Sequence, residues 1–135
     1  MKIKKYWVAG FLAAFSFGFV QKSEPTLKET FKNDFLIGAA INNSHFSGRD
    51  EKGVALIKQQ FNTISPENVL KWESVHPELD QYNFKDSDRY VAFGEKNKMF
   101  IIGHVLVWHN QTPKLVFEDK KGKPESLKLY WSNSG

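Results

Sequence analysis

Residues 35–41 read Phe-Leu-Ile-Gly-Ala-Ala-Ile, a continuous apolar run with the length and character of a strand buried on both faces. Two further short runs follow along the chain, at residues 62–65 and 100–107. Pro66 ends the first of them, because proline has no N–H group to donate to a β-ladder. The three runs predict three short buried strands.

Helical periodicity separates these runs. After Asp50, a plausible cap, Val54, Ile57 and Phe61 recur at spacings of three and four residues, and Leu56 widens the stripe. A second helix is expected to start at Asp86 or Ser87 and to end near Asn97, with an apolar face of Tyr90, Val91 and Phe93. Residues 42–50 and 69–84 are expected to be connections.

Alternation of buried strands with helices predicts the α/β class, with right-handed crossovers and a parallel sheet. Three strands close poorly into a fold of their own, because a parallel sheet must be covered on both faces and both of its edges stay open. The chain therefore has the pattern of one piece of a larger β/α architecture.

The N-terminus has the layout of a secretory signal peptide. Lys2, Lys4 and Lys5 precede an apolar run from Tyr6 to Val20, and a polar stretch follows. As a helix this run would rise about 22 Å, short of the roughly 30 Å hydrocarbon core of a membrane, so a stable membrane anchor is not expected. We expect residues 1–20 to be a signal peptide, residues 21–135 to be the N-terminal part of the larger β/α architecture, and the protein to be secreted, periplasmic or extracellular.

Composition limits the classes of partner. The formal charge of the 135 residues is +4, but without the three leader lysines the chain has 16 basic and 15 acidic side chains. This balance gives no excess of positive charge of the kind that binds nucleic acid. Aromatic residues make up 15%, and such rings either fill a core or face something flat and apolar, for which a sugar ring is one candidate.

Polar and aromatic side chains cluster after the second and third predicted strands, where β/α architectures place their ligand sites. On a strand, His104, Leu106 and Trp108 would share one face, and His109 would point to the other. A sugar has hydroxyl groups around its rim and C–H faces above and below. A cluster of Glu, Asn, Lys, His and Trp side chains suits it chemically.

The sequence here resembles glycoside hydrolase family 10, whose best known members are endo-1,4-β-xylanases. The resemblance is carried by three segments: Phe61-Asn-Thr-Ile-Ser-Pro-Glu-Asn-Val-Leu-Lys-Trp-Glu73, Tyr82-Asn-Phe84 with Asp88, and Gly103-His-Val-Leu-Val-Trp-His-Asn-Gln-Thr-Pro113. It implies a (β/α)8 TIM barrel, of which this chain would hold the first three β/α units.

The resemblance also implies roles for six residues. Glu67, Asn68 and Lys71 match positions that hydrogen-bond the xylose on the non-reducing side of the cleaved bond. His104, Trp108 and Gln111 match positions that line the adjacent subsite. The expected ligand is xylan or a xylooligosaccharide, and no cofactor is implied.

Retaining glycosidases need two carboxyl groups about 5 to 5.5 Å apart. In the family these are glutamates after strands four and seven, and nothing after Gln111 resembles either motif. We therefore expect no catalytic residue in this chain, no activity of the chain alone, and the remainder of the barrel as a partner. Two alternatives stay open: a non-catalytic carbohydrate-binding fragment, and a non-functional truncation.

Each site residue has a simpler interpretation. Glu67 and Lys71 have the spacing of an ion pair on a surface helix, Trp72 could pack in the core, and a histidine such as His104 in an apolar strand is commonly a core residue. His104 and His109 would point to opposite faces of a strand, so we expect no metal site.

Overall fold

The computed structural model of the chain describes residues 24–119 and 121–124. Its elements are, in order, α1 (Leu27–Thr30), β1 (Gly38–Ile41), α2 (Asn43–Phe46), α3 (Glu51–Gln60), β2 (Thr63–Pro66), α4 (Trp72–Val75), α5 (Lys85–Lys96), β3 (Phe100–Ile101) and the 3-10 helix η1 (Lys114–Val116). The predicted signal peptide lies outside the described residues. In the described part of the chain, no helix is both long and apolar enough to cross a membrane.

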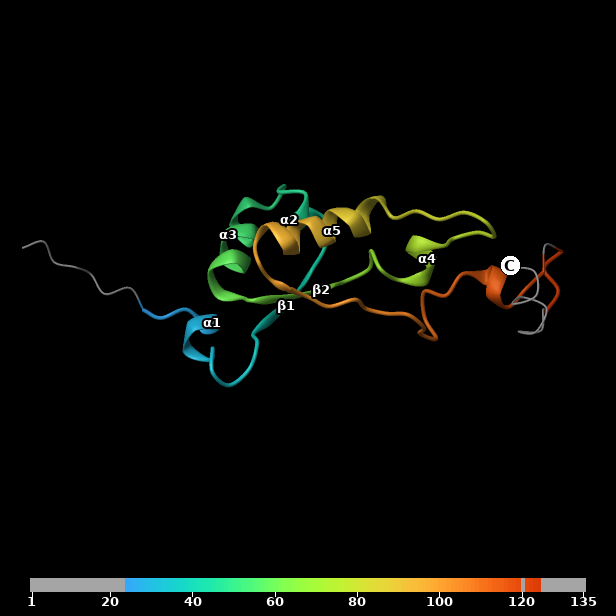
Figure 1. Cartoon of the computed structure of the whole chain (residues 1–135). Coiled ribbons are helices and arrows are strands. Elements are labelled where there is room, and N and C mark those ends of the chain that lie inside the picture. The colour runs from blue at the N-terminus through green and yellow to red at the C-terminus, as the bar shows by residue number, and fades with distance from the viewer. Residues whose placement is uncertain (1–23, 120, 125–135) are drawn as a thin grey trace, which may run out of the picture.

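The three strands form a parallel sheet in the order β1-β2-β3. Gly38 pairs with Thr63 between the first two strands, and Thr63 pairs with Phe100 between the second and third. The predicted α/β class and parallel sheet are confirmed. Helices α2, α3 and α5 lie together on one side of the strands, while α4 and η1 follow at the carboxyl end of the sheet (Figure 1).

The core lies between the sheet and these helices. Ile41, Ile64 and Tyr90 are completely buried, and Ile57, Phe93 and Met99 pack with them. Helix α5 lies close against the sheet at Gly94, where an added Cβ would come within 2.5 Å of the side chain of Ile101. A larger residue at this position would push the helix off the sheet.

Helix α3 forms as its periodicity predicts. The Asp50 side chain accepts a hydrogen bond of 2.9 Å from the backbone N–H of Gly53, so it caps the helix. Ile57 is buried, and Val54 and Phe61 pack against the core. The prediction for Leu56 is wrong, because this side chain is exposed on the outer side of the helix.

Burial of the first strand on both faces is also wrong. The strand begins at Gly38, and Phe35 and Leu36 before it are exposed. Within β1, exposed residues alternate with more buried ones up to the buried Ile41. Strand side chains point to alternate faces, and α2, α3 and α5 cover only one face of the described sheet, so every second residue stays accessible (Figure 1).

Two expected connections contain short helices. Residues 42–50 include α2, whose N-cap Asn42 accepts a hydrogen bond of 3.0 Å from the Ser44 N–H, and residues 69–84 include α4. Helix α5 begins with Phe84 as its N-cap, so the predicted starts at Asp86 or Ser87 are wrong. Its end at Lys96, before Asn97, matches the prediction.

Strand β3 stops at Ile101, far short of the predicted end at residue 107, and β2 explains why. The Ile102 N–H donates to the Ile64 carbonyl at 2.9 Å. In a parallel ladder the Ile102 carbonyl would next accept from residue 66, but Pro66 has no N–H. The buried Tyr90 hydroxyl takes that place, 2.9 Å from the Ile102 carbonyl and also 2.9 Å from the Ile64 carbonyl. Thus Pro66 ends the ladder, Tyr90 satisfies the carbonyl that is left open, and the chain leaves the sheet after Ile102.

We expect Tyr90→Phe to lower the free energy of unfolding by about 1–3 kcal/mol, because the Ile102 carbonyl loses its partner. Burial raises the pKa of Tyr90 to about 12. The folded state therefore holds the proton more tightly than the unfolded state, whose tyrosine pKa is about 10. The stability that comes from neutral Tyr90 is present below pH 10 and is lost as the pH rises from about 10 to about 12.

Urea unfolding followed by circular dichroism at several pH values measures both effects. Tyr82→Phe is the matched control, because Tyr82 is 63% exposed. The lysines titrate equally in Tyr90→Phe and Tyr82→Phe. An equal loss of stability between pH 10 and 12 in wild type and Tyr90→Phe would contradict the role given to the hydroxyl.

Candidate sugar-binding site

Lys71 lies at the centre of the site. It follows β2 in a tight turn, in which its N–H donates to the Asn68 carbonyl at 2.9 Å, and it is only 5% exposed. Its Nζ lies 3.0 Å from His104 Nδ1 and 4.3 Å from the centre of the Trp108 ring. A buried ammonium must be compensated, and here a histidine nitrogen and an aromatic face do so. The lysine thereby joins the segments that follow β2 and β3.

This contact fixes the proton on His104. An ammonium group has three donors and no acceptor, so His104 Nδ1 must be the acceptor. In the neutral ring the proton then lies on Nε2, which becomes a hydrogen-bond donor. The His104 side chain is exposed, so this donor is accessible to a ligand.

Gln111 forms a second link between the two segments. Its side-chain Nε2 donates to Asn68 Oδ1 at 3.2 Å, and its backbone carbonyl accepts from the Glu73 N–H at 3.0 Å. Gln111 has φ of 54°, a left-handed conformation that few non-glycine residues adopt. One hydrogen bond to the loop after β2 and one to α4 hold Gln111 at this turn.

Glu67 is held from the first strand. Its N–H donates to the Ile41 carbonyl at 3.0 Å, and the Nδ2 atom of Asn42 lies 3.4 and 3.3 Å from its two carboxylate oxygens. Sequence reasoning missed Asn42. The rule that singled out the residues after β2 and β3 applies to it as well, since Asn42 directly follows β1.

The six predicted site residues therefore fall into three groups of contacts. Lys71 meets His104 and Trp108, Asn68 meets Gln111, and Glu67 meets Asn42. The reason given for grouping His104 with Trp108 is wrong, because residues 102–108 do not form a strand. Lys71 brings the two together instead. His109 also departs from its prediction, because its ring contacts the Trp108 ring in an edge-to-face arrangement, with the ring centroids 5.3 Å apart.

The simpler interpretations have different outcomes. Residues 67–71 form no helix, and the described contacts of Glu67 and Lys71 are with Asn42 and His104, so the surface ion pair is wrong. His104 is exposed rather than a core residue. Trp72 is half-buried, and its indole N–H donates to His76 Nδ1 at 3.3 Å.

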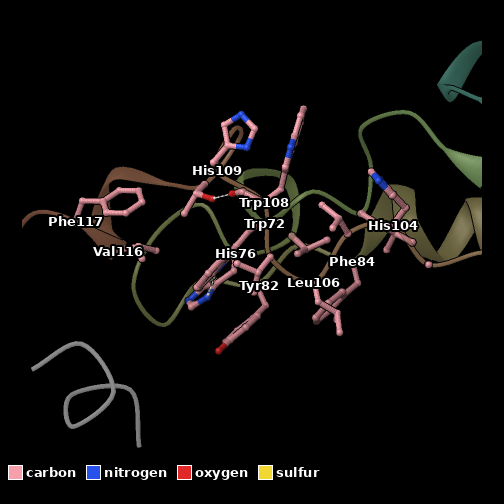
Figure 2. A pocket seen from close by; sticks show the side chains of 16 residues that line it. Trp72, His76, Tyr82, Phe84, His104, Leu106, Trp108, His109, Val116 and Phe117 are labelled. Carbon is pink, nitrogen blue, oxygen red and sulfur yellow. Dashed lines mark hydrogen bonds between the residues drawn. The ribbon is translucent and has the colours of Figure 1, made fainter. Parts of the chain in front are cut away.

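A groove of about 980 Å³ extends from this site. Figure 2 shows His104 at one end and Val116 and Phe117 at the other. Between them the lining is largely apolar and aromatic, with side chains that include Leu70, Trp72, His76, Tyr82, Phe84, Leu106 and Trp108. Within residues 24–119 and 121–124, no three His, Asp or Glu side chains gather closely enough to hold a metal ion.

Polar and aromatic side chains converge beyond the carboxyl ends of the parallel strands. This arrangement is typical of the class of β/α ligand-binding and barrel proteins. The particular family follows from comparison with known proteins. The sequence model of the family described as "Glycosyl hydrolase family 10" matches residues 26–133. This chain belongs to glycosyl hydrolase family 10.

Relatives and solved structures agree with this assignment. The chain is 43% identical over 104 residues to endo-1,4-beta-xylanase A of Xylanibacter ruminicola, a match covering 77% of this chain and 28% of that protein. It is 41% identical over 115 residues to a beta-1,4-xylanase of Dictyoglomus thermophilum, with 82% and 32% covered. A crystal structure of an endo-1,4-beta-xylanase from Caldicellulosiruptor owensensis matches with a TM-score of 0.69 and 38% identity, over 81% of this chain and 32% of that one.

The chain thus spans about a third of the length of these relatives. Its three-stranded parallel sheet is a part of the family fold, as the sequence predicts, and the complete (β/α)8 barrel is implied by the structural neighbours.

Proposed function

We propose that this chain is the N-terminal part of an endo-1,4-β-xylanase that hydrolyses β-1,4 xylan with retention of configuration, and that it holds half of the glycone binding surface. The observation that carries the proposal is the Lys71 ammonium, buried between the His104 ring and the Trp108 face at the carboxyl end of the sheet. The names of the relatives, which are endo-1,4- and β-1,4-xylanases, support the choice of xylan.

Each side chain of the site has a different role in binding a xylose unit. Glu67 offers carboxylate acceptors, Lys71 has two N–H donors besides the one facing His104, and the Nε2–H of His104 is a further donor. Trp108, 36% exposed, offers a flat face for the C–H side of a sugar. Rim hydroxyls and a ring face are the two features by which a pyranose is recognised.

We expect the wild-type chain to bind xylotriose and Lys71→Met to bind it at least about 10-fold more weakly, because a charged hydrogen-bond donor is lost and His104 is released. Titration calorimetry measures the affinity. Lys114→Met is the matched control, since Lys114 is an exposed lysine in η1. Equal affinities for wild type and Lys71→Met would contradict the proposed site.

The chemical step needs two carboxyl groups about 5 to 5.5 Å apart, one to protonate the leaving oxygen and one to attack the anomeric carbon. We propose that both belong to parts of the family fold outside these 135 residues. The support is the sequence itself, in which nothing after Gln111 resembles either glutamate motif.

The groove supports a partner for this chain, namely the remainder of a family 10 barrel. Leu106, 93% exposed, and Val107 present apolar surface in its lining. His76 gives an independent indication. Its Nδ1 accepts from Trp72, so Nε2 carries the proton in the neutral ring, yet this buried Nε2 has no acceptor among the described residues. A covering surface would supply that acceptor and bury the apolar side chains.

We expect no release of reducing sugar from xylan by the chain alone, and hydrolysis when it is mixed with the part of the Dictyoglomus thermophilum xylanase that follows the matched region. Leu106→Asp is expected to prevent this complementation, because it places a charge on the docking surface. The matched control is Leu56→Asp, an exposed leucine on the outer side of α3. Hydrolysis by the isolated chain would refute the proposal that the catalytic groups lie elsewhere.

Secretion is the remaining part of the proposal. It is supported by the three N-terminal lysines and the apolar run from Tyr6 to Val20. Expression of the full chain in a bacterium, followed by N-terminal sequencing of the periplasmic fraction, is expected to give a product that starts shortly after residue 20. Recovery of the product only in the cytoplasm with its first residues intact would contradict secretion.

A further inference from the structure

The amide of Asn42 has one orientation that satisfies its neighbours. Its Oδ1 accepts two hydrogen bonds from Ser44, 3.0 Å from the backbone N–H and 2.7 Å from the hydroxyl. Because both partners are donors at these contacts, the carbonyl end of the amide must face them. The Nδ2 end is then turned away from α2 and lies 3.4 and 3.3 Å from the two Glu67 oxygens.

The backbone of Asn42 is held as firmly as its side chain. Its N–H donates to His45 Nδ1 at 3.1 Å, and His45 Nε2 lies 3.6 Å from an oxygen of Asp50, the cap of α3. Asn42 is thus fixed between the end of β1 and the starts of two helices. The Glu67 side chain, in contrast, is exposed and has several rotatable bonds to immobilise before it can accept a sugar hydroxyl.

We propose that Asn42 is a positioning residue, which holds the Glu67 carboxylate ready to accept hydrogen bonds from the sugar. This inference rests on the proposed function and adds to it a residue directly after β1 that does not itself need to touch the sugar. The amide carries no charge and gives the carboxylate long hydrogen bonds, so lone pairs on both Glu67 oxygens remain open for hydroxyl groups.

Asn42→Asp separates positioning from capping. Aspartate has nearly the same shape and keeps an acceptor for Ser44, so α2 stays capped. It loses the donor and sets a second carboxylate against Glu67. We expect the thermal midpoint to stay close to that of wild type and the affinity for xylotriose to fall about 10-fold or more. Unchanged affinity would overturn the inference.

Asn43→Asp is the matched control. Asn43 Nδ2 donates to Asp86 at 3.0 Å, so this variant places two carboxylates together between α2 and α5, at a contact that does not involve Glu67. We expect its xylotriose affinity to stay within about two-fold of wild type. This change is smaller than the tenfold loss, equivalent to about 1.4 kcal/mol, that is expected for Asn42→Asp. An equal loss of affinity in both variants would show a general effect on α2 and would overturn the inference.

A second measurement needs no sugar. In NMR spectra of the full chain, the side-chain amide signals of Asn42 are expected to move on Glu67→Gln substitution and those of Asn43 to stay in place. If the wild-type chain fails to bind xylotriose, the proposed function is wrong. The amide signals then still test the contact between Asn42 and Glu67. If the Asn42 amide signals do not move on Glu67→Gln substitution, the inference is overturned, whether or not the chain binds xylotriose.

Discussion

A buried ammonium group, held by a histidine ring and an indole face, organises the described part of this molecule. Removing a charge from water is costly, and the Lys71 Nζ recovers stability from one histidine nitrogen and one indole face. Those partners lie more than thirty residues further along the chain. The segments after β2 and β3 must therefore lie against each other for the lysine to be buried. Gln111 reinforces the same junction through Asn68 and Glu73.

The site also depends on where the sheet ends. Pro66 cannot continue the ladder toward β3, and the Tyr90 hydroxyl from α5 takes the carbonyl that is left open. The backbone after Ile102 is then free to depart from strand geometry, which lets His104 and Trp108 approach Lys71 from one side. A proline on β2 and a tyrosine on α5 thus determine the path of residues on a third element.

Much of this fold could be predicted from local patterns in the sequence. Asp50 with the stripe of Val54, Ile57 and Phe61 predicted α3, and the alternation of short strand-like segments with helical patterns predicted the three parallel strands. The length of β3 could not be predicted, because it depends on Pro66 in another strand and not on the apolar residues of 100–107. Exposure of Leu56 and Phe35 depends on which surfaces the helices cover, which local periodicity does not report.

The candidate site was predicted in composition but not in geometry. The resemblance supplied six positions, and their spacing suggested a strand face where the structure has a lysine-centred cluster. Asn42 was missed because residues 42–50 were expected to be only a connection, although Asn42 directly follows β1 as the other site residues follow β2 and β3.

The protonation state of His104, measured by ¹⁵N NMR on the full chain at a pH where the ring is neutral, tests whether Lys71 organises the site. The lysine contact predicts a proton on Nε2 and an unprotonated Nδ1, and it predicts that this preference weakens in Lys71→Met. A proton on Nδ1, or ring signals that are the same with and without the lysine, would contradict it.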